Sequence, residues 1–466
     1  MQLFGGDVIN RVLSFYRDAE YFREVQKIAV PIIIQQLMFS GLNMLGVVFV
    51  GQKGDASVAA VGLAGQVAFL LNLVHFGIIS GAAMFTAQFW GRSDIPNLRR
   101  VLGLCLMLAI SASLIFFALA QFLPFQILGI YSKDTAVIEL GATYMRTFSW
   151  TFLFFAVTFS YALVMRSTGD VKTPTAVSVV ALTISTFLSY SLIFGKFGLP
   201  EVGIRGAAIA AVIARAFECI TLITITYLKK SPVAASLREL TDFDVTFVSK
   251  VIKPMLPVIL NELFWSLGIT TYNIIYGHMG TSSFAAMNIV GTIEQVAFVL
   301  FIGISNATSV LVGNRIGAGK EEEAFVYAGR SIGLGILGGM LIGAALQLVK
   351  APVLSLYNVS PDVLGNVSHI INVVTFFLWI RVNNMTIVVG ILRAGGDTRF
   401  SLFLDGIIIW LVGVPMAYLA AFVLHLPVYF VYLFAMSEEA TKWLLGISRY
   451  RSRKWINNLA AQVEGI

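Results

Sequence analysis

The sequence predicts an all-α membrane protein whose twelve transmembrane helices form two pseudo-symmetric six-helix bundles around a central cleft. Three observations predict it. Of the 466 residues, 58% are hydrophobic and only 12% are charged, apolar runs of helix length recur along the chain, and the second half repeats the first. A soluble core cannot hide this much apolar surface, so lipid must solvate most of it. The runs are continuous rather than alternating, which excludes a transmembrane barrel.

Polar breaks between the apolar runs define the spans, because about 20 apolar residues cross a bilayer core. The first six lie near 28–50, 56–88, 101–123, 136–165, 175–198 and 204–228, and the second six near 257–279, 283–313, 329–349, 363–392, 400–423 and 427–447. We therefore expect an N-terminal segment (1–27), a first lobe (28–228), a connector (229–256), a second lobe (257–447) and a tail (448–466).

Basic residues predict the orientation. Of the 32 Lys and Arg residues, 24 fall on the side that holds both termini, Arg393 and Lys442 among them, and three fall within spans. Five fall on the other side, namely Lys53, Lys133, Lys196, Arg205 and Lys350. The positive-inside rule then places both termini in the cytoplasm of a multi-pass cell-membrane protein. This topology explains the net charge of +7 without a nucleic-acid partner, and the N-terminal segment lacks the pattern of a secretory signal peptide.

An internal repeat supports two copies of one six-helix unit. A shift of 226 residues brings Pro31 onto Pro257 and Gly91 onto Gly317, and a shift of 227 brings Arg166 onto Arg393. Because six is even, both halves enter the membrane in the same direction. Two such lobes can alternate access between the two faces, although duplication also builds channels and stable bundles.

Charged side chains inside the spans are costly in lipid, so each needs a partner or a function. Glu262 lies one turn into the seventh span and shares a helix face with Trp265, Asn273 and Tyr276. A carboxylate on such a face suits a site for a proton or a sodium ion. The alternative is a carboxylate held in a structural hydrogen-bond network.

The first half serves as an internal comparison for this site. Gln36 falls opposite Glu262 at the 226-residue shift, and Ala68 falls opposite Glu294, so the two carboxylates belong to the second half alone. We therefore predict that cation coupling resides in the second lobe, at Glu262 and Glu294.

The tenth span carries further polar groups of this predicted site. The amides of Asn383 and Asn384 can supply oxygen atoms to a cation, and Arg381 can neutralise Glu262 or Glu294 or form a structural ion pair. The expected groups of the substrate cleft, or partners of its charges, are Gln36, Asn43, Trp265, Asn273, Tyr276 and Arg381.

The remaining intramembrane charges are assigned structural roles. Arg215 and Glu218, three residues apart on the sixth span, are expected to pair within their helix, and Arg146 and Asp405 to stabilise their lobes. The paired turns at 166–170 and 393–397 are interpreted as sharp reversals.

No cofactor is predicted. The P-loop pattern is absent, and the two cysteines and four histidines form no metal-ligand spacing. The expected ion is H⁺ or Na⁺, with a candidate Na⁺ site at Glu262, and the expected partners are a small organic substrate and membrane lipids around a monomer.

Three stretches, 257–268, 313–319 and 392–397, together with the twelve spans, resemble the multidrug and toxic compound extrusion (MATE) family from about residue 20 to 455. The resemblance implies an antiporter that exports organic, often cationic, compounds in exchange for H⁺ or Na⁺, with Glu262 in cation coupling. The chain departs from the family where acids are expected near Asn43 and in the tenth span, which leaves the identity of the coupling ion open.

The alternative functions are a flippase for lipid-linked or amphipathic substrates and a membrane-embedded enzyme. An enzyme is not predicted, because the sequence shows no cluster of His, Asp or Ser near one face.

Overall fold

A computed structural model describes residues 18–355, 357 and 359–464. The described part of the chain is nearly all helical and contains no strand. Ten of its helices are long and apolar enough to cross a membrane. The expected all-α membrane fold is therefore confirmed, although residues 1–17 of the expected N-terminal segment and the last two residues of the expected tail lie outside the described residues.

The chain forms two compact units, one of Pro31–Met255 and the other of Leu256–Ile466 with Met1–Val30. Helix α2 (Ala19–Gly51) contributes its first turns to the second of these and the rest to the first. The unit of Pro31–Met255 continues with α3 (Asp55–Gly91), α4 (Ile95–Phe122), α5 (Pro124–Tyr131), α6 (Thr135–Phe148), α7 (Trp150–Ser167), α8 (Lys172–Phe194), α9 (Ile204–Leu228) and α10 (Leu237–Thr241).

The other unit, called here the C-terminal unit, begins in α11 (Val245–His278), which starts twelve residues before the expected seventh span. It continues with α12 (Thr281–Gly317), α13 (Glu321–Leu354), α14 (Pro361–Met385), η1 (Thr386–Arg393), α15 (Thr398–Ser401), η2 (Leu402–Ile407), η3 (Ile409–Gly413), α16 (Val414–Tyr418), η4 (Leu419–Val423), α17 (Val428–Ala435), α18 (Ser437–Arg451) and α19 (Leu459–Glu464). The η segments are π-helical, with wider turns that are frequent at functional sites.

Backbone conformation supports the internal repeat. Left-handed φ angles recur at equivalent places: 96° at Gly54 and 116° at Gly280 before α3 and α12, and 86° at Gly169 and 75° at Gly396 in the two turns. Glycine adopts this region without the steric penalty that a Cβ brings. The matched glycines of the two halves thus have similar backbone conformations.

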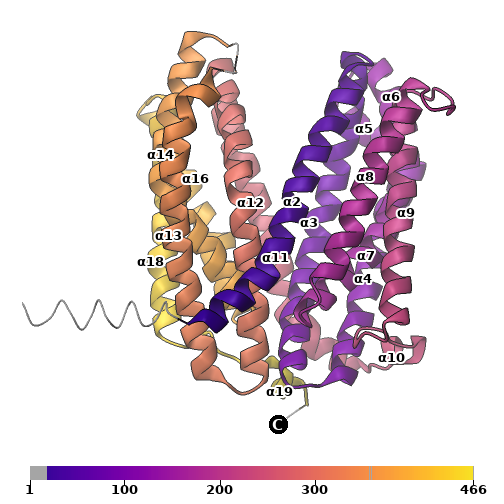
Figure 1. Ribbon diagram of the computed structural model, residues 1–466. Helices are drawn as coiled ribbons and strands as arrows, with labels where there is room; N and C mark the ends of the chain where they lie inside the picture. The colour runs from indigo at the N-terminus through magenta and orange to yellow at the C-terminus, as the bar shows by residue number, and fades with distance from the viewer. Residues whose placement is uncertain (1–17, 356, 358, 465–466) are drawn as a thin grey trace, which may run out of the picture. The chain divides into compact units, whose positions relative to one another are not determined.

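Glycines also set the distance between α13 and α14, which lie side by side (Figure 1). A Cβ at Gly339 would lie 2.5 Å from Trp379 Cα, and one at Gly343 would lie 2.9 Å from the Thr375 carbonyl oxygen. Membrane helices pack through dispersion forces at such small-residue seams, because lipid is as apolar as leucine. The seam fixes α14, which carries several site residues.

The connector between the expected lobes contains a short capped helix. Ser236 Oγ accepts a hydrogen bond from the backbone N–H of Glu239 at the start of α10. In return Glu239 accepts one from the backbone N–H of Ser236, and it also contacts Arg99 on α4. The Ser236 backbone and hydroxyl donors and the Arg99 guanidinium lower the pKa of the Glu239 carboxyl below its ordinary value of 4.5.

Candidate cation-coupling and substrate sites

Glu262 on α11 is buried and forms an ion pair with Arg393 at the end of η1. The Arg393 Nη2 to Glu262 Oε1 distance is 2.7 Å, and the two side chains are 3% and 11% exposed. The turn at 393–397 was expected to be structural, and Arg393 was expected on the cytoplasmic side. The structure instead places this arginine inside the C-terminal unit, against the predicted coupling carboxylate.

The first half contains the neutral counterpart of this pair. Arg166 Nη2 donates to Gln35 Oε1 at 2.7 Å. At the 227-residue shift, Arg166 corresponds to Arg393 and Gln35 to Glu262. The 226-residue shift had matched Glu262 with Gln36, so the structure moves the equivalence by one position. The fold therefore makes the same contact twice, once with an amide and once with a carboxylate.

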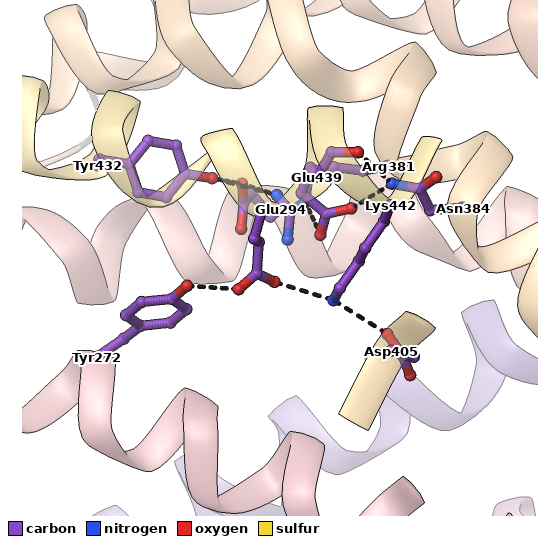
Figure 2. A network of polar contacts seen from close by, with 9 residues as sticks. Tyr272, Glu294, Arg381, Asn384, Asp405, Tyr432, Glu439 and Lys442 are labelled. Atoms are coloured by element: carbon purple, nitrogen blue, oxygen red, sulfur yellow. Dashed lines mark hydrogen bonds and ion pairs between the residues drawn. The ribbon is translucent and has the colours of Figure 1, made fainter. Parts of the chain in front are cut away.

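A lysine on α18 bridges a buried and a half-buried carboxylate in a second cluster (Figure 2). Lys442 Nζ lies 3.1 Å from Asp405 Oδ1 and 2.9 Å from Glu438 Oε1. Tyr272 Oη donates to Glu438 Oε2 at 2.5 Å. Asn261, next to Glu262, donates its amide N–H to Asp405 at 3.0 Å, which links this cluster to the helix of the first pair. Asp405, expected only to stabilise its lobe, thus links the Lys442 cluster to the helix of the Glu262–Arg393 pair.

A third cluster surrounds Arg381 on α14 (Figure 2). Arg381 forms an ion pair with Glu294 on α12, and Tyr432 Oη donates to the same carboxylate at 2.5 Å. Asn384 donates its amide N–H to Glu439 Oε2 at 2.7 Å. Of the two acids that Arg381 was expected to neutralise, its partner is Glu294.

These clusters hold more negative than positive charge. Five carboxylates are joined in them, but three cationic side chains balance them: Glu262, Glu294, Asp405, Glu438 and Glu439 against Arg381, Arg393 and Lys442. An uncompensated buried carboxylate costs several kcal/mol. The arrangement therefore favours the uptake of positive charge from outside the chain.

The other predicted residues of the second lobe do not gather around Glu262. Asn383 is buried and donates to the Trp379 carbonyl oxygen of its own helix at 2.8 Å. Trp265 and Asn273 are exposed. Tyr276 is 3% exposed and packs in an apolar core cluster with Tyr272. The predicted helix face is therefore divided between buried and exposed environments.

The unit of Pro31–Met255 contains a pocket of about 500 Å³ lined mainly by apolar side chains. Its lining includes Phe39, Asn43, Asn72, Phe155, Arg215 and Glu218. Arg215 and Glu218 form the expected ion pair at 2.6 Å, and the guanidinium lies 5.0 Å from the centre of the Phe155 ring. Asn43 lines this pocket, while Gln36 is half-buried on the same helix. Their place in a substrate cleft stays a prediction.

Sequence reasoning missed Glu438, Glu439 and Lys442. Both acids lie inside the expected span 427–447, and the spacing of Glu438 and Lys442 is that of a helical ion pair. That spacing was the available signal. Lys442 was instead counted with the cytoplasmic tail, whereas its side chain is 2% exposed.

Long apolar helices with linked charges buried among them define a polytopic membrane transporter. Among the described residues, no group of three or more His, Cys, Asp or Glu side chains has the arrangement of a metal site. The MatE family model matches residues 31–191 and 257–419, once in each half of the repeat. The chain belongs to the MatE family, a family of multidrug efflux transporters.

Named relatives and solved structures agree with this assignment. The chain is 25% identical over 434 residues to the probable multidrug resistance protein YoeA of Bacillus subtilis, covering 92% of this chain and 93% of the relative. It is 24% identical to the probable multidrug resistance protein NorM of Thermotoga maritima, covering 94% and 93%. The bent form of the Vibrio cholerae MATE transporter VcmN shares its fold with a TM-score of 0.84 at 16% identity, covering 94% and 99%. A MOP superfamily transporter from Pyrococcus furiosus gives 0.82 at 19%, covering 92% and 96%.

Proposed function

We propose that this chain is a proton-coupled antiporter that exports organic, amphipathic compounds by alternating access of its two units. The observation that carries the proposal is the Glu262–Arg393 pair, in which the buried carboxylate already forms an ion pair with an arginine of the same chain. A sodium ion at Glu262 would have to displace the Arg393 guanidinium and then find further oxygen ligands. A proton needs only one carboxylate oxygen, so a proton suits this site better.

The same reasoning extends to the other acids. Glu294 is held by Arg381, and Asp405 and Glu438 are held by Lys442. Each of these carboxylates is therefore already paired with a cationic side chain. This occupation supports protons over sodium as the coupling ion.

The coupling step follows from the chemistry of the pair. When Glu262 takes up a proton from the water on the side to which the protein is open, its charge disappears and the attraction for Arg393 falls. Helix α11 and segment η1 are then held together less tightly. Release of the proton to the other side restores the ion pair.

The pocket of the other unit is the candidate substrate site. Its phenylalanine side chains suit the flat apolar part of an amphipathic compound, because aromatic rings bind such surfaces with favourable stacking geometry. Glu218 and the Asn43 and Asn72 amides can accept hydrogen bonds from a cationic or polar head group. Breaking the Arg215–Glu218 pair would make the Glu218 carboxylate available to an organic cation.

The test is transport by purified protein in lipid vesicles, with a proton gradient and a sodium gradient imposed separately. We expect the proton gradient alone to drive substrate movement. The Glu262→Gln variant should lose gradient-driven transport while still binding substrate, since glutamine reproduces the Gln35–Arg166 contact of the first half. Glu239→Gln, at the exposed connector, is the matched control and should transport normally.

Two results would overturn the proposal. Transport driven by sodium in the absence of a proton gradient would refute the choice of ion. Unchanged proton-driven transport in the Glu262→Gln variant would remove Glu262 from the mechanism.

The proposed orientation, with both termini in the cytoplasm of the cell membrane, has its own test. A single cysteine introduced at Glu239 in the connector should react with a membrane-impermeant reagent only after the cytoplasmic face is exposed. One at Lys196, in the loop between α8 and α9, should react from the outside of intact cells.

A further inference from the structure

The Tyr272–Glu438–Lys442–Asp405 cluster is linked through Asn261 to the helix of Glu262 and is built from three segments that are distant in sequence. Glu438 and Lys442 come from α18, Asp405 from η2 and Tyr272 from α11. Glu438 and Lys442 are 3% and 1% exposed, so water is largely excluded. Because the cluster is assembled by tertiary contacts, it has a defined geometry.

Glycine at position 413 allows this geometry. A Cβ at Gly413, the last residue of η3, would overlap both Tyr272 Oη and Glu438 Oε2. The tyrosine and the carboxylate therefore meet against bare backbone. This close approach gives the Tyr272 to Glu438 hydrogen bond its length of 2.5 Å.

Lys442 occupies the place that a small cation would take between two carboxylates. Its ammonium group lies 3.1 Å from Asp405 and 2.9 Å from Glu438. One positive charge thus compensates two negative charges. The adjacent Glu439 forms a longer ion pair with Arg381, with 3.9 Å between Glu439 Oε1 and Arg381 Nε. Buried carboxylates with too few counter-charges are stabilised when one of them is protonated.

Two buried amide oxygens provide an independent indication that a donor is missing. Asn261 and Asn384 each donate an amide N–H to a carboxylate of the network, to Asp405 and Glu439 respectively. The Oδ1 atoms of both residues are buried without a hydrogen-bond partner. Leaving a buried acceptor unpaired costs about 1–3 kcal/mol. A protonated carboxyl group adds the O–H donor that such a network lacks.

The surroundings of Glu438 comprise the charged and titratable groups of every neighbouring segment of the network. They are Lys442 and Glu439 on α18, Tyr272 and Tyr276 on α11, Asp405 on η2, Arg381 on α14, Glu294 on α12 and Tyr432 on α17. With Glu438 itself, the set contains four acids and two bases. The balance favours a proton at Glu438.

We propose that Glu438 is a second proton-exchange site, and that Lys442 is a built-in counter-ion that keeps sodium out of the Asp405–Glu438 pair. The proposal rests on the proton-coupled function proposed above and names a further site for it. Proton uptake converts the Glu438 carboxylate to a neutral carboxylic acid, and Lys442 then forms an ion pair with Asp405 alone. On release, the proton returns to water and Lys442 again bridges the two carboxylates.

The experiment is an infrared pH titration of the purified full chain in lipid nanodiscs, without substrate or gradient. The band of protonated carboxyl groups should lose the equivalent of one group in the Glu438→Gln variant. Tyr272→Phe should keep that group but shift its band. Phenylalanine has nearly the shape of tyrosine but lacks the hydroxyl that donates a hydrogen bond to the Glu438 carboxyl. Glu239→Gln, at an exposed carboxylate that is ionised at neutral pH, should leave the band at neutral pH unchanged.

Sodium exclusion is tested by thermal unfolding in sodium and choline chloride at equal ionic strength. Wild-type protein should unfold at the same temperature in both salts, whereas Lys442→Met should be stabilised by sodium. An equal response of both proteins to sodium would refute the role of Lys442. An unchanged carboxyl band in Glu438→Gln, together with an unshifted band in Tyr272→Phe, would refute the proton site even if one variant folded poorly.

These outcomes separate the two proposals. Loss of the band in Glu438→Gln with sodium-driven transport would leave Glu438 as a proton site and refute the proton-coupled antiport. Proton-driven transport that depends on Glu262, with no band change at Glu438, would leave the antiport and refute the second site.

Discussion

Replacing Arg393 by methionine tests how strongly the coupling carboxylate depends on its base. Glu262 is 8% exposed and its oxygen lies 2.7 Å from the guanidinium, so removal of the arginine leaves a buried carboxylate without a counter-charge. Breaking a buried ion pair by removing one partner costs about 3–5 kcal/mol. For a unit of this size, 1 kcal/mol corresponds to roughly 2–4 °C, which predicts a fall in the unfolding temperature of about 6–20 °C.

Thermal unfolding in detergent, followed by tryptophan fluorescence, measures this loss in four proteins: wild type, Arg393→Met, Glu262→Gln and the double variant. The double variant removes both charges and should recover most of the lost stability. The deficit of Arg393→Met should also shrink at lower pH, since a protonated Glu262 needs no counter-charge. Arg393→Met with wild-type stability at neutral pH, or a double variant no more stable than Arg393→Met, would refute the reasoning.

Three further predictions concern the packing, the connector and the pocket. Gly339→Ala should lower the free energy of unfolding by about 1–3 kcal/mol in denaturation experiments, because its Cβ would meet a backbone, whereas Gly365→Ala in open space should stabilise α14 by up to about 1 kcal/mol. Because the pKa of the Glu239 carboxyl is lowered on folding, its contribution to stability is present above the ordinary value of 4.5 and is lost as the pH falls through the lowered value. The difference in unfolding temperature between wild type and Glu239→Gln should therefore vanish in acid. A difference that stays constant with pH would contradict this. Phe155→Ala should weaken the binding of an aromatic fluorescent cation about tenfold, measured by fluorescence polarisation, and Phe122→Ala, which is 79% exposed, should leave it unchanged.

Most of the helical architecture could be predicted from the sequence, because lipid imposes length and hydropathy on every span. The differences arise where one expected span is interrupted. The fourth is divided into α6 and α7 at Ser149, and the twelfth into α17 and α18 at Met436. Each break is a single residue, so a hydropathy average over the length of a span does not register it.

The site was less predictable because tertiary contacts, rather than residue types, decide which charges are buried. Arg393 and Lys442 were assigned to the cytoplasmic side by their place near the ends of spans, yet both lie inside the C-terminal unit. The π-helical segments η1, η2 and η3 carry Arg393, Asp405 and Gly413. A π turn adds a residue and rotates the side chains that follow it, so α-helical spacing does not predict which face they occupy.

The repeat finally separates the structural part of the Arg393 contact from its proposed function. Arg166 and Gln35 make the same 2.7 Å contact in the first half, so the geometry does not require a carboxylate. An amide keeps its neutral charge at every physiological pH, whereas a carboxylate changes its charge, so a proton can alter the contact in the second half alone. Gln35→Glu should therefore make the first half respond to pH as the second is proposed to do, and the variant should lose thermal stability on acidification more steeply than wild type. If its pH dependence equals that of wild type, protonation of a carboxylate in this contact does not control how tightly its helices are held.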